Sequence, residues 1–590
     1  MRWQGRERFT VLELGFGSGQ RFLAIWQAWR DDKQRPNRLV FVAVEPRPVP
    51  RAELVRLDAS SLSADLADLA GQLTEAWPPP TRGLHPLFFD AGRVELLLAF
   101  GEVSRLLPAL RLQADAIHLC SRPGPAPTGW ESRVLKAIGR RAAVGATLTA
   151  DGATQPRHES LRAAGFEVEP TAAGGDSTAP ALATTATFAP RFVPPRPVPA
   201  PRTALVIGAG LAGAAVAQAL ARRGVAVTVL EQHATAAAGT SANPAALFHG
   251  TVHADDGPYA RLFRAAALFA ARDFRAAGLA VDGLLRLATA EAAALPDAAG
   301  LPADFVRGVG SAEACALAGT RLPSPAWHFA SGGWAEPAVW VRHALARPGI
   351  ALRTGVHVAC IEHASNADGR SWSAFDGTGD CVAAADLLVL ANAEACSPLL
   401  AARGHAAWPL QRRRGQVSWW LPAQPHGLRL PVAGDGYAIP LPGGALLCGA
   451  TRQDDDDDTT VRVADHAENL RRLRSLTGIG PSTGAALSGW VGWRLHSDDR
   501  LPIAGAMPLA SLPSHPTPRQ RLDQPRWLPR EPGLFVLTAL GARGLTLAPL
   551  LGELIAAQAT GDAWPLEQDL ADAVDPGRWL VRAARNNPVR

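Results

Sequence analysis

A pattern of strand, glycine-rich turn and helix occurs twice in this chain and constrains its fold more than any other feature. The first copy reads FTVLEL, GFGSG and FLAIWQAW and starts at Phe9. The second reads ALVI, GAGLAG and AAVAQALARRG and starts at Ala204. This pattern is typical of parallel α/β units whose loop closely approaches a nucleotide. The sequence therefore predicts an α/β protein with two Rossmann-type domains.

The length of the chain also requires more than one domain. Its 590 residues exceed the roughly 250 to 300 at which a single core stops growing. Residues 171–202 are rich in Ala, Thr and Pro and end in PRFVPPRPVPAPR, which predicts an extended linker without regular structure. We therefore expect a first domain over 1–170, this linker, and a second domain over 203–590.

Composition narrows the class of protein. Hydrophobic residues make up 47% and charged residues 19%, and no run of about 18 apolar residues suggests a membrane span. The N-terminus lacks a signal-peptide pattern, so we expect a cytoplasmic protein without a membrane partner. The six cysteines show no metal-ligand spacing, which favours buried, reduced thiols and no metal site. A net charge of +5 permits an anionic partner such as nucleic acid.

The second glycine-rich loop carries a complete dinucleotide fingerprint. Gly208, Gly210 and Gly213 follow a strand and precede a helix, and Glu231 ends the next strand. The glycines allow a tight turn and close approach to a pyrophosphate, while the acid is suited to the ribose hydroxyls. The glycine loop by itself would be weak support for dinucleotide binding, but here the strand, the helix and the acid accompany it. We expect these residues to bind a dinucleotide.

A second glycine motif near the end of the chain favours FAD over NAD. In GLFVLTALGARGLTLAPLLGELIA, the residues Gly541, Arg543, Gly544 and Leu545 directly precede a helix. Backbone amides at a helix start can face the flavin edge, where negative charge develops on reduction. Taken alone, the same glycines would be an ordinary helix cap.

The first loop predicts an S-adenosylmethionine site at the carboxyl ends of strands. Its candidate residues are Glu13, Gly15, Gly17 and Gly19 of LELGFGSG, Glu45 at the end of the second strand, and Glu102 after Gly101. The glycines would approach the methionine moiety, Glu45 the ribose and Glu102 the adenine. Another nucleotide-binding Rossmann unit is the alternative.

The second domain resembles the D-amino-acid oxidase and glycine oxidase group. The resemblance includes DLLVLANAEA at 386–395, which is expected to be a strand, and the segment GWVGWRLHSDDRLPIAG at 489–505. It implies a FAD-binding Rossmann-type domain with an interleaved antiparallel-sheet substrate domain. It also implies that Arg494 holds the substrate carboxylate and that Tyr437, in GDGYAIP, lines the same pocket. A structural ion pair for Arg494 and a core position for Tyr437 are the alternatives.

Over nearly its full length the chain resembles the bifunctional tRNA 5-methylaminomethyl-2-thiouridine biosynthesis (MnmC) family. The matching stretches include LELGFGSGQRFL, VEPRPVPRAEL, GRVELLLAFGEVSRLLPAL, GTSANPAALFHG, GDGYAIP and DPGRWLVR. The resemblance implies that a FAD-dependent domain removes the carboxymethyl group from 5-carboxymethylaminomethyl-(2-thio)uridine at the tRNA wobble position. A methyltransferase domain then methylates the exposed amine. Because the substrate side chain is an N-substituted glycine, Arg494 is expected to hold its carboxylate.

Several positions depart from the family pattern. Cys120 stands where the family has an aspartate poised near the amine, and Arg21 replaces an asparagine in the first glycine loop. The family also has a longer segment ahead of that loop, so we expect an N-terminally short methyltransferase domain with weak or no methyl transfer. In the flavin half, Ala242 replaces a glycine, whereas Ser241 and Asn243, expected at the FAD site, remain.

Arginines offer candidate contacts to the tRNA anticodon loop. Two groups stand out: Arg412, Arg413 and Arg414, and then Arg578, Arg582 and Arg585. Arginine suits phosphates and splayed-out bases, and the modified base must leave its stack to react. Solvated or acid-paired arginines are the alternative, and DDDDD at 454–458 is expected to be a solvated loop. Neither DNA binding nor an oligomer is predicted, and a monomer is plausible.

Two rival functions remain open at this stage. One is a small amine or amino-acid oxidase of the sarcosine or glycine oxidase kind, with a non-catalytic N-terminal domain. The other is a non-catalytic tRNA-binding protein, which the intact flavin fingerprint and Arg494 disfavour.

Overall fold

The computed structural model divides the chain into two compact units. It describes residues 3–58, 64–119, 131–150, 155–169, 184–191, 200–366, 369–511 and 521–586. The first unit comprises Met1–Ala200 together with Thr560–Asp569, and the second comprises Pro201–Ala559 with Leu570–Arg590. Within the described residues no helix is long and apolar enough to cross a membrane.

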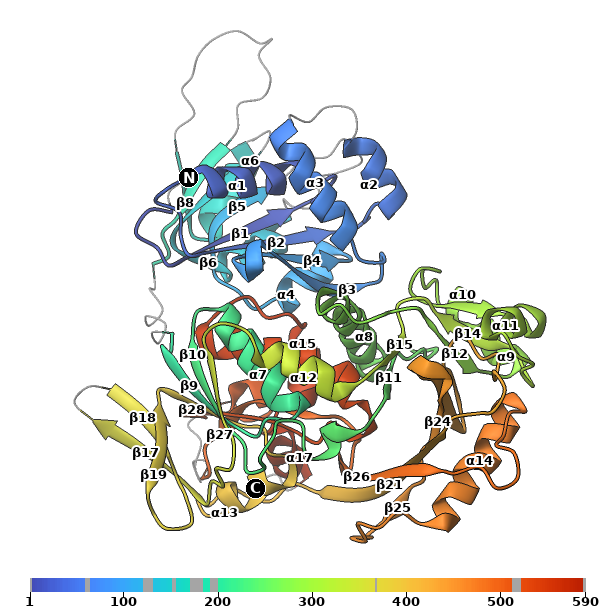
Figure 1. Cartoon of the computed structure of the whole chain (residues 1–590). Helices are drawn as coiled ribbons and strands as arrows, with labels where there is room; N and C mark the ends of the chain where they lie inside the picture. Colours follow the sequence, from blue (N-terminus) through green and yellow to red (C-terminus); the bar gives the residue numbers. More distant parts are fainter. Residues whose placement is uncertain are drawn as a thin grey trace. The chain divides into compact units, whose positions relative to one another are not determined.

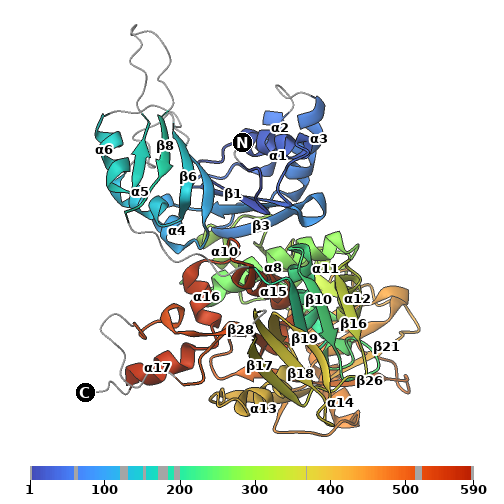
Figure 2. The ribbon, with the colours of Figure 1, turned by 90° about the vertical axis from the view of Figure 1, so that its left-hand side faces the viewer.

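The first unit is built on an eight-stranded sheet (Figures 1 and 2). Its order is β3 (Gly83–Phe89), β4 (Val94–Phe100), β2 (Arg38–Glu45), β1 (Arg8–Leu14), β5 (Ala114–Leu119), β6 (Ala142–Ala150), β8 (Thr184–Phe188) and β7 (Phe166–Val168). The five strands from β4 to β6 run parallel, and the outer strands pair antiparallel. This order confirms the α/β fold expected for the first half.

Both faces of this sheet are buried under helices, which explains the continuous apolar runs of its strands. Its helices are α1 (Gln20–Asp31), α2 (Arg51–Asp58), α3 (Ala64–Ala76), η1 (Asp90–Gly92), α4 (Val103–Ala109), α5 (Ser132–Gly139) and α6 (Gln155–Ala163). Alternate residues of β2 point to opposite faces of the sheet and belong to two different hydrophobic cores. Val40 packs with Ile138 of α5, whereas Phe41 packs edge-on to Phe22 of α1, with ring centroids 5.3 Å apart.

A segment from near the C-terminus completes the first unit. The Arg8 guanidinium donates to the Thr560 carbonyl at 3.2 Å and also pairs with Asp562. Arg38 pairs with the same carboxylate and with Glu95, and the Asp562 side chain is fully buried. The sequence, which assigned all of 203–590 to the second domain, did not anticipate this segment.

The expected linker is not free of regular structure. Thr184–Phe188 forms β8 and pairs with both β6 and β7. Ala186 and Phe188 are buried on one side of the sheet while Thr185 is exposed, so alternation outweighs the Ala- and Thr-rich composition. The prediction of an irregular segment over 171–202 is therefore wrong at this strand.

The second unit contains a six-stranded, mainly parallel sheet. Its order is β16 (Ile350–Arg353), β10 (Ala226–Leu230), β9 (Thr203–Ile207), β20 (Leu387–Leu390), β28 (Arg530–Thr538) and β27 (Ile503–Pro508). Helices α7 (Leu211–Arg222) and α15 (Gly544–Thr560) touch closely beside it. A Cβ on Gly552 would lie 2.6 Å from the backbone carbon of Ala215, so only glycine allows this approach.

A nine-stranded sheet forms the other half of this unit. It comprises β13 (Arg307–Val309), β14 (Ala326–Phe329), β12 (Leu284–Leu287), β22 (Val432–Gly434), β23 (Gly436–Pro440), β24 (Leu446–Gly449), β21 (Leu410–Trp420) and β25 (Gln453–Asp454), with β26 (Ser488–Ser497) paired to β21. Only β12 and β22 pair in parallel. The curved ribbon of β24, β21 and β26 is visible in Figure 1. This arrangement confirms the expected antiparallel sheet.

Smaller elements complete the second unit. They are the pair β11 (Ala246–Phe248) and β15 (Gly333–Ala335), the three-stranded sheet of β17 (Cys360–Asn366), β18 (Gly369–Phe375) and β19 (Cys381–Ala385), and the helices η2 (Thr240–Ala242), α8 (Pro258–Ala276), α9 (Ala290–Ala293), α10 (Leu295–Ala298), α11 (Ser311–Ala318), α12 (Pro337–Leu345), η3 (Ala393–Ala395), α13 (Cys396–Ala401), η4 (Pro442–Gly444), α14 (Val463–Thr477), η5 (Pro525–Trp527), η6 (Gly541–Arg543), α16 (Gln568–Val574) and α17 (Arg578–Asn586).

Two further expectations need correction. Cys396 and Cys448 are buried as expected, but Cys360 and Cys381 are exposed because they lie on the small three-stranded sheet. Cys315 is half-buried, and Cys120 lies outside the described residues. The strand expected over 386–395 ends at Leu390 and gives way to η3.

Candidate functional site

The dinucleotide loop of the second unit has a geometry that only glycine permits. Gly208 follows β9 with φ +100°, and a Cβ there would lie 2.7 Å from the Ala391 carbonyl oxygen. A Cβ on Gly213 would lie 1.8 Å from the Gly208 carbonyl oxygen. A Cβ on Gly210 would lie 3.0 Å from the Ser241 hydroxyl oxygen. These close approaches make the tight turn that a pyrophosphate needs.

Two side chains brace this loop. One Glu231 oxygen accepts a hydrogen bond from the Ala209 amide at 2.8 Å, and the other accepts from the His233 amide at 3.0 Å. The Ser241 hydroxyl accepts from the Leu211 amide at the start of α7, at 3.0 Å. The predicted ribose acid and the predicted serine therefore meet at the loop, from opposite ends of its turn.

The late glycine motif lies against the same loop. Gly541–Arg543 form η6, and Gly544 and Leu545 begin α15. A Cβ on Gly544 would lie 3.3 Å from the Leu211 side chain at the start of α7. The two predicted parts of the FAD site, about 330 residues apart in sequence, are thus neighbours, and the cradle fits a dinucleotide cofactor.

Arg494 lies on β26 of the nine-stranded sheet. Its guanidinium donates to the Thr451 carbonyl at 2.5 Å and more weakly to the Arg414 carbonyl at 3.4 Å. A Cβ on Gly415 would lie 2.2 Å from its Nη2 atom, so glycine on β21 makes the space for it. Burial lowers the pKa of Arg494, and no carboxylate among the described residues pairs with it. The structural ion pair considered above is therefore absent there.

Tyr437 lies within electrostatic range of Arg494 and is hydrogen-bonded to Asn243. Burial raises the pKa of Tyr437 to about 12, while the nearby Arg494 charge and a hydrogen bond with Asn243 act to lower it. The Asn243 Oδ1 atom is buried without a hydrogen-bond partner in the described part of the chain. Because an unpaired buried acceptor is costly, this atom is suited to a ligand donor. Ser241 and Asn243, two residues apart, therefore face different parts of the candidate site.

The sequence reasoning missed His496. It lies two residues after Arg494 on β26, so both side chains point to the same face. A Cβ on Gly541 would lie 2.6 Å from its Nδ1 atom, which places the ring against η6. Burial, with the charges of Arg413 and Arg494, lowers the pKa of His496 to about 4. A neutral imidazole thus lies beside the candidate site, and strand alternation alone would have identified it.

The candidate residues of the first unit meet at the carboxyl ends of β1, β2 and β4. One Glu45 oxygen accepts from the Gly17 amide at 2.9 Å, and the other accepts from the Arg47 amide at 2.9 Å. The Gly101 amide donates to the Glu45 carbonyl at 3.0 Å, which places Glu102 next to it at the start of α4. This arrangement repeats the bracing of the second loop.

The glycines of the first loop adopt a positive-φ backbone conformation that other residues rarely adopt. Gly15, Gly17 and Gly19 have φ values of +93°, +63° and +80°. Near them, Arg21 lies 3.4 Å from the buried carboxylate of Glu13. A cation therefore already contacts one of the acids expected to bind S-adenosylmethionine. Cys120, expected beside the amine to be methylated, lies outside the described residues.

Most arginines proposed for RNA contact are paired with acids. The pairs are Arg412–Asp457 at 2.7 Å, Arg413–Asp454 at 2.8 Å, Arg414–Asp465 at 2.6 Å, Arg578–Asp499 at 2.9 Å and Arg582–Asp499 at 2.7 Å. Arg585 donates to the Asp523 carbonyl. Arg414 is fully buried and Arg578 nearly so, which excludes both from an RNA-binding surface. Four acids of the stretch expected to be a solvated loop, Asp454 and Asp456–Asp458, are consequently ion-pair partners.

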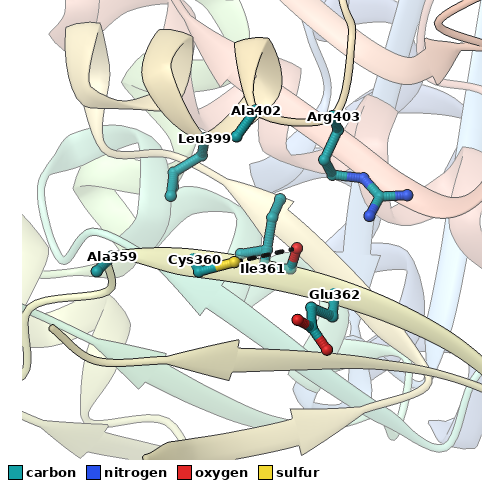
Figure 3. A pocket seen from close by; sticks show the side chains of 7 residues that line it. All are labelled: Ala359, Cys360, Ile361, Glu362, Leu399, Ala402 and Arg403. Atoms are coloured by element: carbon teal, nitrogen blue, oxygen red, sulfur yellow. Dashed lines mark hydrogen bonds between the residues drawn. The ribbon is translucent and has the colours of Figure 1, made fainter. Parts of the chain in front are cut away.

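A pocket of about 290 Å³ lies away from these residues (Figure 3). It opens between β17 and α13, with Cys360 and Glu362 on the strand and Leu399 and Arg403 opposite. Arg403 is already engaged, since it pairs with Glu531 at 3.0 Å and lies over the Trp372 ring. None of the predicted flavin or substrate residues lines this pocket, so it is not the candidate site.

Sequence comparisons assign each unit to a family. Residues 203–558 match the FAD dependent oxidoreductase family, and residues 64–180 match an S-adenosyl-L-methionine-dependent methyltransferase family. A tRNA 5-methylaminomethyl-2-thiouridine biosynthesis bifunctional protein from Methylibium petroleiphilum is 43% identical, over 99% of this chain and 92% of that protein. The protein of the same name from Paraburkholderia phytofirmans is 40% identical, over 100% and 92%.

A solved structure supports the fold of the second unit. L-Proline dehydrogenase from P. horikoshii superposes with a TM-score of 0.50 at 16% sequence identity. The match covers 66% of this chain and 100% of that one. At this identity the similarity concerns the fold alone.

Proposed function

Because the chain belongs to the family of bifunctional tRNA 5-methylaminomethyl-2-thiouridine biosynthesis proteins, we propose that it modifies the wobble uridine of tRNA in two steps. Residues 203–590 oxidatively remove the carboxymethyl group from 5-carboxymethylaminomethyl-(2-thio)uridine. Residues 1–170 then methylate the exposed amine with S-adenosylmethionine. The reaction takes place in the cytoplasm, on the anticodon loop of tRNA.

The observation that carries this proposal is the environment of Arg494. Its guanidinium is buried, lacks a carboxylate in the described residues, and lies near Tyr437, whose hydrogen-bond partner Asn243 has a buried oxygen without a partner there. Burying an arginine without a counterion costs folding free energy, unless a bound anion neutralises its charge. The carboxylate of an N-substituted glycine is such an anion, and a guanidinium fork binds it in a fixed orientation.

The residues of the chain position this substrate. FAD, when bound at Gly208–Gly213 and Gly541–Leu545, supplies the acceptor for the hydride of the carbon next to the amine. Arg494 fixes the carboxylate, so that the carbon–hydrogen bond to be broken has one orientation. With a pKa of about 12, Tyr437 keeps its hydroxyl proton at neutral pH and can donate a hydrogen bond to the bound carboxylate.

In the first unit the chain would hold S-adenosylmethionine and the amine. Glu45, already fixed by the Gly17 amide, is placed for the ribose, and Glu102 lies next to it for the adenine. Glu13 would attract the positively charged methionine moiety, in competition with Arg21. Methyl transfer therefore depends on residues that differ from the family at Arg21 and Cys120.

The relatives favour this function over the small-molecule oxidase considered above. Proteins named for tRNA modification match 92% of their own length, across both units. A free amino-acid oxidase would have no use for the first unit.

Mass spectrometry of tRNA nucleosides tests the proposal. Purified protein is incubated with tRNA carrying the 5-carboxymethylaminomethyl group, with and without S-adenosylmethionine. We expect 5-aminomethyluridine without it and 5-methylaminomethyluridine with it. Loss of the carboxymethyl group without later methylation would restrict the function to the second unit. No change in the tRNA, together with rapid oxidation of sarcosine or glycine, would overturn the proposal.

A further inference from the structure

Besides Arg494, two further largely buried arginines of the second unit have no ion pair among the residues that the structure describes. Arg264 pairs with Asp256 at 2.6 Å, as Arg414 and Arg578 pair with their own carboxylates. Arg286 on β12 and Arg543 in η6 differ, because the structure gives neither of them an ion pair among the residues it describes. Their positive charges are therefore not neutralised by the fold.

A neutral histidine holds Arg543 in place. The Arg543 Nη1 atom lies 2.9 Å from His249 Nε2, and His249 Nδ1 lies 2.6 Å from the Gly250 carbonyl oxygen. Because a carbonyl only accepts, Nδ1 carries the proton and Nε2 accepts from the guanidinium. Burial, with the charges of Arg543 and Arg286, lowers the pKa of His249 well below its usual range. The histidine thus orients Arg543 without adding or removing charge.

Arg286, Arg543 and Tyr259 lie within electrostatic range of one another. Burial, with the charge of Arg286, lowers the pKa of Arg543 to about 10, and burial also lowers the pKa of Arg286, while Tyr259 acts to raise both pKa values. No carboxylate contributes to either shift. At pH 7 both arginines therefore carry their charge. Tyr259 is 36% exposed, so the cluster reaches solvent.

The strand register places this cluster on the same face as the candidate active site. Arg286 pairs with Ala433 of β22, which pairs with Tyr437 of β23. Directly paired residues point to the same side of a sheet, and neighbouring strands are about 4.8 Å apart. The Arg286 and Tyr437 backbones are thus separated by two strand spacings, or about 10 Å. Along the same face the row continues through Gly449 and Val417 to Trp490 of β26.

We propose that Arg286, together with Arg543 at the edge of the predicted flavin cradle, forms a phosphate-binding subsite that holds the backbone of the wobble nucleotide while Arg494 holds its carboxylate. This inference rests on the proposed function. A modified nucleotide within RNA carries two kinds of anion, the side-chain carboxylate and the phosphodiesters on either side. Two arginines without ion pairs beside the site are suited to the phosphodiesters, since the guanidinium fork fits phosphate geometry. The other source of phosphate is the pyrophosphate of FAD, which the experiment separates from RNA.

Binding and kinetics of Arg286→Gln test the subsite. Binding of an anticodon stem-loop RNA to the FAD-loaded protein is measured by fluorescence anisotropy at several salt concentrations. We expect about tenfold weaker binding and a log–log salt slope reduced by about 1. In steady-state oxidation, KM should rise about tenfold for the stem-loop that carries 5-carboxymethylaminomethyluridine. KM for the free nucleoside, which has no phosphate, should not change.

Two further variants complete the design. Arg286→Lys keeps the charge and should retain most of the affinity. Arg307→Gln, which removes an arginine of β13 that pairs with Glu313 of α11, should behave as wild type. Unchanged stem-loop affinity in Arg286→Gln, an equal rise in KM for both substrates, or a matching loss of FAD affinity would each overturn the subsite. A wild-type protein that binds the stem-loop but oxidises neither substrate would overturn the proposed function, while the salt slopes still decide the subsite.

Discussion

The two glycine-rich loops of this chain share one bracing device but differ in what surrounds it. In each unit an acid after the second strand, Glu45 or Glu231, accepts a hydrogen bond from a loop amide, at 2.9 Å and 2.8 Å. In the second unit Ser241 adds a further brace at the helix start. In the first unit Arg21 instead contacts Glu13 at 3.4 Å. Loops with the same backbone hydrogen bonds therefore need not bind their ligands equally well, because nearby side chains change the charge around each loop.

The largest effect is expected from Gly213→Ala in the second loop. The new Cβ would lie 1.8 Å from a backbone oxygen that cannot move without breaking the turn. We expect flavin content, measured as flavin absorbance per protein, to fall below about a tenth of wild type. Gly377→Ala is the control, because nothing lies within 4 Å of its Cβ position. Full flavin content in Gly213→Ala would show that this loop does not bind the cofactor.

Arg494→Gln should separate the two units functionally. Loss of a charge-assisted, bidentate contact of about 3 kcal/mol lowers kcat/KM for oxidation roughly hundredfold. Methylation of tRNA that already carries the free amine should proceed as in wild type. Steady-state assays of both reactions check this, with Arg494→Lys expected to lie between. Equal loss of both activities would point to a folding defect.

Acid should act in opposite directions on the stability contributed by two aspartates, Asp499 of the second unit and Asp115 of the first. Bidentate pairing with Arg578, against the opposing effect of burial, leaves the pKa of Asp499 at about 2. The stability that Asp499 contributes is therefore complete above its unfolded pKa near 3.9 and is lost as pH falls toward 2. Burial instead raises the pKa of Asp115 in the first unit, so its contribution is complete below the unfolded pKa and is lost as pH rises.

Asp499→Asn measures the acid effect in the second unit. We expect it to lower the free energy of unfolding by about 2 kcal/mol at pH 7 and by progressively less toward pH 2. Thermal unfolding across this pH range provides the measurement. Asp523→Asn, which removes an exposed carboxylate, is the control. A pH-independent difference between Asp499→Asn and wild type would contradict the assignment.

The smallest expected effect is a gain. Arg21→Asn removes the cation that contacts Glu13 and should raise the affinity for S-adenosylmethionine about tenfold, or ~1.4 kcal/mol. Isothermal titration calorimetry compares it with Arg133→Gln, which removes an exposed arginine of α5. Unchanged affinity in Arg21→Asn would mean that Arg21 and the ligand do not compete for Glu13.

Much of the fold and of the candidate site was predictable because it depends on sequence patterns within short stretches of the chain. The strand, glycine turn and helix at Gly208–Gly213 and the acid at Glu231 follow one another within a short stretch, and both lie where expected. Arg494 was found through a resemblance, and strand alternation would also have found His496. By contrast, β8 was missed because its Ala- and Thr-rich composition hid a buried Ala186 and Phe188. For Arg412–Arg414 the sequence left RNA contact and acid pairing both open, because their acidic partners lie about 40 to 50 residues away along the chain.

The sequence by itself determined two nucleotide-binding units, their order, and the acids that brace their loops, since each depends on residues close along the chain. Only the tertiary structure decided which charges are neutralised. It paired Arg414 with Asp465 and left Arg286, Arg494 and Arg543 without carboxylates among the described residues. The physical reason is that an ion pair depends on distance in space, and a buried charge without one has to find its counterion in a ligand.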